Sequence, residues 1–90
     1  MKATLLIHER MIFEDGGILV IKVWRVPEAV APARHSLKYS LFYGRHNERL
    51  VGYDNERGKG DHRHYGEHEE RYRFTSIKRL LADFRSDVEA

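Results

Sequence analysis

The sequence has 90 residues, 33% of them charged and 41% hydrophobic, and a formal net charge of +2. This length fits a single domain covering residues 1–90, and the composition is typical of a folded soluble protein, which excludes a disordered tail. The absence of cysteine excludes a disulfide scaffold, a thiolate zinc site and a cysteine nucleophile. A chain of this size buries only about two-thirds of its unfolded surface, so a homodimer or a bound partner is expected to add stability.

The N-terminal segment does not have the pattern of a targeting signal or a membrane span. Its apolar run from Leu5 to Ile7 is followed at once by His8, Glu9 and Arg10. This run is shorter than the core of a signal peptide and far shorter than a transmembrane helix. We therefore expect a cytoplasmic protein that makes no membrane contact.

Four segments have the pattern of β-strands, namely residues 4–13, 18–26, 37–43 and 49–55. Apolar and polar residues alternate in the first and third, which predicts strands with one buried face. The second is apolar on both faces and contains Trp24, which is expected in the core. That pattern is typical of a central strand covered on both sides or at a dimer contact. Asp15 and Gly16 predict a tight hairpin between the first two strands.

The C-terminal segment changes to the spacing of an amphipathic helix. Thr75 or Ser76 is the expected N-cap, because its hydroxyl can accept a hydrogen bond from the first turn. Phe74 stands where a hydrophobic staple ahead of a Thr75 cap would lie. The apolar stripe consists of Ile77, Leu80, Leu81, Phe84 and Val88.

Together these elements predict an α+β fold, a four-stranded antiparallel meander sheet packed by one C-terminal helix. A polar stretch, residues 53–66, is expected to connect the fourth strand to the helix. It holds three glycines, three cations and two histidines, and nothing in it predicts a core segment. Such a stretch is either a solvated connection or a functional site.

The spacing of His62 and His64 is the feature of this stretch that points to chemistry. On an extended chain both imidazoles lie on the same face. An imidazole titrates near neutral pH and serves as a general acid or a general base. Metal-free RNA cleavage needs such a pair, together with cations that stabilise the charge developing on the phosphate.

The candidate site therefore has two parts. The catalytic candidates are His62, His64, Asp54 and Asp61, with the two carboxylates as orienting groups. The candidates for binding the substrate and its phosphates are Lys59, Arg63, Arg57, Tyr53 and Tyr65. The tyrosines would stack on bases, although tyrosines on strands more often pack within the fold.

Three alternatives stay open at this stage. His62 and His64, with His68 or Asp61, could hold a divalent metal, and the protein would then be a metal-dependent hydrolase. The stretch could instead bind nucleic acid or a protein without turnover, and its affinity for nucleic acid would then fall steeply with salt. Two histidines beside an arginine also occur on surfaces that have no function. The leading hypothesis, an endoribonuclease, requires no cofactor.

Several motifs resemble those of a known protein family. They are Val23-Trp24-Arg25-Val26-Pro27, Lys38-Tyr39, Gly52-Tyr53-Asp54-Asn55, Gly58-Lys59-Gly60-Asp61-His62-Arg63-His64 and Phe74-Thr75. Over nearly the whole chain the sequence resembles the TumE-type toxins of bacterial toxin–antitoxin systems, long classed as a domain of unknown function. The resemblance implies a cytoplasmic toxin neutralised by a cognate antitoxin, which is expected to be a helix-turn-helix protein encoded beside it.

Action on RNA is favoured by analogy with other small toxins. Many toxins of this size are metal-independent ribonucleases built on a small antiparallel sheet, as in RelE-like proteins. This chain lacks the N-terminal helices that RelE-like toxins usually carry, so the analogy covers the type of activity and not that particular fold.

Overall fold

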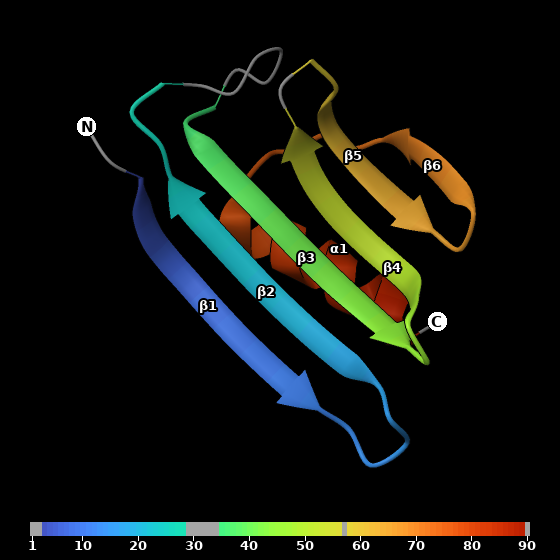
Figure 1. Ribbon diagram of the computed structural model, residues 1–90. Coiled ribbons are helices and arrows are strands. Elements are labelled where there is room, and N and C mark those ends of the chain that lie inside the picture. Colours follow the sequence, from blue (N-terminus) through green and yellow to red (C-terminus); the bar gives the residue numbers. More distant parts are fainter. Residues whose placement is uncertain (1–2, 29–34, 57, 90) are drawn as a thin grey trace.

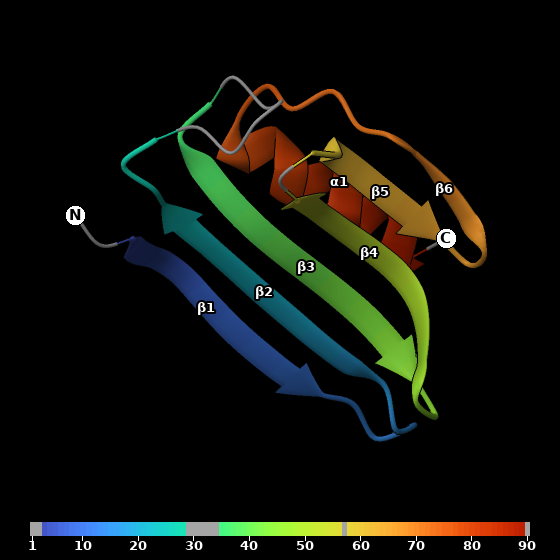
Figure 2. The same ribbon diagram turned by 45° about the horizontal axis from the view of Figure 1, so that its top comes forward.

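The computed structural model describes residues 3–28, 35–56 and 58–89. Six antiparallel strands form one sheet in which every strand pairs with its neighbours in the sequence. The helix lies along one face of this sheet, and no described element covers the other face, called the open face below (Figures 1 and 2). The elements are β1 (Thr4–Ile12), β2 (Ile18–Arg25), β3 (Leu37–Arg45), β4 (Glu48–Glu56), β5 (Gly60–Tyr65), β6 (His68–Arg71) and α1 (Ile77–Glu89).

Tight hairpins join β1 to β2 and β3 to β4. In the first, Gly16 has a φ of 87° and the Asp15 carboxylate accepts a hydrogen bond of 2.9 Å from the Gly17 amide. In the second, His46 and Asn47 have φ values of 54° and 63°. Positive φ at both central residues is what the shortest hairpins require, because the twist of such a turn matches that of the strands.

The core lies between the helix and the sheet face toward which it packs. Tyr53 of β4 is fully buried there, and its ring meets the rings of Tyr72 and Phe84 edge to face at 4.9 and 5.8 Å. Such pairs add to the stabilisation that the aromatic rings gain from burial. The buried apolar residues are Leu19, Ile21, Val23, Tyr39, Leu41, Val51, Tyr53, Leu80 and Phe84.

The helix begins at one of the two predicted caps. The Ser76 Oγ accepts a hydrogen bond of 3.1 Å from the Arg79 amide, so Ser76 is the cap and not Thr75. With Ser76 as the cap, Phe74 does not directly precede it; the Phe74 ring packs against His35 and Tyr39, at 4.1 and 5.9 Å. No helix in the described ranges is long and apolar enough to cross a bilayer.

The prediction of four strands is wrong, because the sheet has six. The polar stretch does not simply connect the fourth strand to the helix: its first residues belong to β4, and it continues into β5, which forms a hairpin with β6. Gly66 supplies the positive φ of that turn. Charged pairs such as Arg63 with Glu70 replace apolar contacts between these two strands, so neither strand shows the alternation of apolar and polar residues that identified the others.

The second strand is also less covered than predicted. Its residues Leu19, Ile21 and Val23 are buried toward the helix, whereas Val20 and Trp24 lie half-buried on the open face. Trp24 stands beside Lys38 in the register and is not a core residue. Aromatic surface therefore remains accessible on the open face.

Candidate active site

The alternation of side chains along β5 places the two histidines on the open face. His62 lies opposite Asp54 and His64 opposite Gly52, while Arg63 between them lies opposite the buried Tyr53. Cα atoms two positions apart on a strand are separated by about 7 Å. The two imidazoles thus share a face, as the spacing predicts, and stand far enough apart to flank one phosphate.

The hydrogen bond of His62 determines which of its ring nitrogens is available. His62 Nδ1 lies 3.0 Å from the Gly60 carbonyl oxygen. A carbonyl oxygen only accepts, so Nδ1 carries the hydrogen and Nε2 of the neutral ring keeps its lone pair. That nitrogen can accept a proton from a substrate.

His64 has the opposite tautomer. Its Nδ1 lies 3.0 Å from a terminal nitrogen of Arg49. A guanidinium only donates, so Nδ1 accepts and Nε2 carries the hydrogen in the neutral ring. Gly52 makes room for this contact, because a Cβ atom there would stand 2.9 Å from Cδ of Arg49.

Glu69 of β6 lies next to both rings. Its carboxylate oxygens are 3.8 Å from Nε2 of His62 and 3.9 Å from Nδ1 of His64. Both histidine side chains are about 15% exposed, whereas that of Glu69 is 43% exposed. A partly buried imidazole pair beside one guanidinium and one carboxylate is a cluster able to hold and move a proton.

The open face carries a continuous row of polar side chains, one from each strand. Adjacent strands lie about 4.8 Å apart, so a row across six strands spans roughly 24 Å. Successive members are paired in the register of each strand pair. The row is His8, Lys22, Ser40, Asp54, His62 and Arg71.

Of the two candidate carboxylates, Asp54 shares this row with the histidines and Asp61 lies on the helix side. Asp61 Oδ1 accepts hydrogen bonds from the Tyr39 hydroxyl at 2.6 Å and from His35 Nε2 at 2.8 Å. Burial, and then the bond to Asp61, raises the pKa of the Tyr39 phenol far above its usual value. Asp61 therefore ties the start of β5 to the start of β3.

Arg63 and Tyr53 also lie on the helix side. Arg63 Nε lies 2.5 Å from Glu70, and a terminal nitrogen of its guanidinium is 3.6 Å from Asp87. The Tyr53 hydroxyl donates to Asp87, and burial followed by that bond raises the pKa of Tyr53 to about 12. Tyr53 is a core residue in this structure, the packing role that tyrosines on strands usually have.

The remaining candidates are scattered. Lys59 is exposed in the turn before β5. Tyr65 is paired with the buried Val51 of β4, so its side chain belongs to the helix side. Arg57 lies outside the described residues. The structure thus brings together His62, His64 and Asp54 and separates them from the other candidates that it describes.

The residues suggested for a metal do not form one cluster. His68 stands opposite Tyr65 and therefore on the other face from His62 and His64. Within residues 3–28, 35–56 and 58–89, no three histidine, aspartate or glutamate side chains are arranged to hold a metal ion.

Several side chains of the cluster were not identified from the sequence. Arg49 and Glu69 touch the imidazoles, and Lys22, Ser40 and Arg71 extend the row. They belong to different strands, so only the register brings them together. Alternation along β2 and β3 could have assigned Lys22 and Ser40 to one face. Glu69 and Arg71 were missed because β6 was not identified as a strand.

Comparison with known proteins agrees with the motifs noted in the sequence. No significant match was found among curated proteins or among solved structures. The family model described as toxin TumE matches residues 2–90. This match extends over almost the whole chain and includes all of the strands and the helix described above, and the protein therefore belongs to the TumE toxin family.

Proposed function

We propose that this protein is the toxin of a toxin–antitoxin pair and that it cleaves RNA, without a metal ion, at His62 and His64. Membership of the toxin family supports the first part. The observation that carries the second is the pair of imidazoles on the open face, in which Nδ1 of His62 contacts the Gly60 carbonyl and Nδ1 of His64 contacts Arg49, so that Nε2 of each ring can take part in proton transfer.

The proposed reaction is an internal transesterification. His62 Nε2 takes the proton of a ribose 2′-hydroxyl, and the 2′-oxygen attacks the adjacent phosphorus. The bond from phosphorus to the 5′-oxygen breaks, and protonated His64 gives its Nε2 proton to that oxygen. The products are a 2′,3′-cyclic phosphate and a 5′-hydroxyl.

Arg49 and Glu69 suit the charge changes in this reaction. When His64 is protonated, Nδ1 no longer accepts from Arg49, so the guanidinium is released toward the phosphate, where it stabilises the negative transition state. The Glu69 carboxylate, 3.9 Å from Nδ1, then faces the imidazolium. Asp54, opposite His62, is a second carboxylate on the same face.

The open face suits single-stranded RNA. Lys22 and Arg71 lie in the polar row on either side of the histidines and can contact phosphates. Trp24 and Phe42 are half-buried aromatic residues of the same face, and bases stack on such rings with little sequence preference. A cognate antitoxin, proposed to be a helix-turn-helix protein, would be the partner, and the cytoplasm the place of action.

Growth inhibition tests this function in cells. The wild type is expected to stop growth when its expression is induced, whereas His62→Ala and His64→Ala allow growth because each removes one proton-transfer group. His68→Ala is the matched control, since His68 is exposed and lies on the other face. Circular dichroism of the purified variants checks that each is folded. A folded His64→Ala protein with full toxicity would overturn the proposal.

A further inference from the structure

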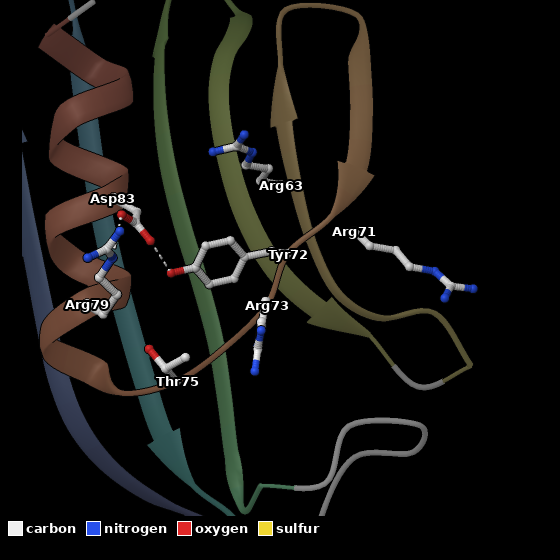
Figure 3. A pocket seen from close by; sticks show the side chains of 7 residues that line it. All are labelled: Arg63, Arg71, Tyr72, Arg73, Thr75, Arg79 and Asp83. Atoms are coloured by element: carbon white, nitrogen blue, oxygen red, sulfur yellow. Dashed lines mark hydrogen bonds and ion pairs between the residues drawn. The ribbon is translucent and has the colours of Figure 1, made fainter.

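A second basic site lies on the helix side of the sheet. It is a pocket of about 500 Å³ beside the N-terminal half of α1, next to β6 and the segment that follows it (Figure 3). Among the described residues, those that line it include four arginines and no aliphatic side chain. They are Arg63, Arg71, Tyr72, Arg73, Thr75, Arg79 and Asp83.

The four arginines differ in how they are paired. Arg79 lies 3.0 Å from Asp83, which also accepts a hydrogen bond of 2.6 Å from the Tyr72 hydroxyl. Arg63 is held by Glu70 and Asp87. Arg71 and Arg73 are exposed and have no acidic partner within the described ranges. The pocket therefore combines two guanidiniums fixed in place with two that are available to an anion.

Arg71 connects this pocket to the histidines. It lies opposite His62 in the β5–β6 register, yet it also lines the pocket. In Figure 3 its side chain extends away from the helix, whereas Tyr72 points toward it. Because β6 is the last strand of the sheet, Arg71 lies at the edge where the open face and the helix side meet.

We propose that the pocket binds backbone phosphates of the same RNA strand whose scissile phosphate lies at His62 and His64. The strand passes around the edge of β6, and Arg71 contacts it on the way. This inference rests on the proposed function, since it assigns the path of that substrate.

The chemistry of the lining favours phosphate over an acidic protein segment. Guanidinium groups bind phosphate through paired hydrogen bonds, and the Thr75 hydroxyl can donate another. A protein partner generally needs a buried aromatic or aliphatic anchor at the centre of its contact. Tyr72 is the one aromatic residue among the described lining residues, and its hydroxyl is already bound to Asp83.

The test compares Arg73→Glu with Arg85→Glu. Arg73 is exposed and has no acidic partner among the described residues, so its replacement should not disturb the fold. Arg85 is the control, because it carries the same charge on the exposed side of α1, outside the pocket. Each of the two variants also carries His64→Ala, which prevents cleavage of the RNA. The affinity of each protein for a single-stranded RNA of about 12 nucleotides is then measured by fluorescence anisotropy. We expect Arg73→Glu to weaken binding about tenfold or more and to reduce the slope of log K against log salt, by about 0.7 for each phosphate that is no longer neutralised. Arg85→Glu should change affinity less than twofold.

A dinucleotide substrate separates the two sites. It reaches the histidines but not the pocket, so Arg73→Glu with intact histidines should cleave it as fast as the wild type. RNA affinity unchanged by Arg73→Glu would overturn the pocket proposal alone, as would a fall in antitoxin affinity with unchanged RNA affinity. A protein that binds no RNA in any form would overturn the proposed function as well.

Discussion

Among single residues, those that hold each imidazole decide the geometry of the site. His62 is bound to its own strand through the Gly60 carbonyl, while His64 depends on a residue of β4, Arg49. The His64 arrangement is therefore the more sensitive to changes elsewhere. Gly52 is the residue over which Arg49 lies, and it gives a way to disturb Arg49 without removing it.

We predict that Gly52→Ala lowers RNA cleavage while the protein stays folded. The added Cβ would stand 2.9 Å from Arg49 Cδ, a flexible part of a side chain that can move aside. A displacement of about 1 Å at a catalytic group costs up to roughly 100-fold in rate. Cleavage rate and thermal unfolding of the variant are the measurements. An unchanged rate would show that the position of Arg49 does not matter.

Ionisation of a buried tyrosine is expected to lower the stability of the protein at alkaline pH. Burial and the bond to Asp87 raise the pKa of Tyr53 from 10.0 to about 12, so the unfolded chain loses this proton at lower pH than the folded protein. The stabilisation is complete below pH 10 and is lost as pH rises toward 12. Urea unfolding across this range should give a falling free energy of unfolding and a shallower fall for Tyr53→Phe. Equal slopes for the two proteins would contradict the assignment.

Among the strands and the helix, those that form the core were the ones predicted from the sequence. β2, β3, β4 and the helix have apolar patterns because each buries a face, and those patterns can be read without knowing the partner strand. The prediction that the first strand buries one face is wrong, because every residue of β1 except Ile7 is exposed. The β5–β6 hairpin buries little apolar surface and depends on pairs such as Arg63 with Glu70. Nothing in its local sequence distinguishes it from a solvated loop.

The candidate site could also be predicted only in part from the sequence. The shared face of His62 and His64 follows from alternation along one strand, so the sequence was sufficient for it. The contacts of Arg49 and Glu69 depend on register across three strands, which no local pattern contains. Arg63 was grouped with the histidines because it lies between them in the sequence. The same alternation along β5 places its side chain on the opposite face of the sheet.

The N-terminus of α1 can be tested as an element by changing its cap. Ser76→Ala removes the hydroxyl that accepts from the Arg79 amide and should lower the free energy of unfolding by about 1 kcal/mol. Thr75→Ala is the control, because the neighbouring hydroxyl does not cap the helix, and it should change stability by less than half as much. Urea unfolding measures both. A larger loss for Thr75→Ala would place the cap one residue earlier.

In the complete fold, the two faces of the sheet have separate tasks. The helix and the buried tyrosines stabilise one face, and the other carries the polar row and the histidine pair. The sheet therefore holds His62 and His64 at a fixed spacing, which the proposed catalysis by this pair requires. At the edge of β6 the two faces meet, and there the arginine pocket extends the proposed RNA path.

The end groups of RNA cleaved in EDTA decide whether His62 and His64 form a metal-free ribonuclease site. Purified wild type, His62→Ala and His64→Ala proteins are each incubated with RNA in the chelator, and new ends are mapped and analysed. We predict 2′,3′-cyclic phosphate and 5′-hydroxyl ends from the wild type and none from either variant. Cleavage only after a divalent metal is added would make the histidines ligands instead. RNA left intact by the wild type under both conditions, or cut equally by all three proteins, would contradict catalysis by this pair.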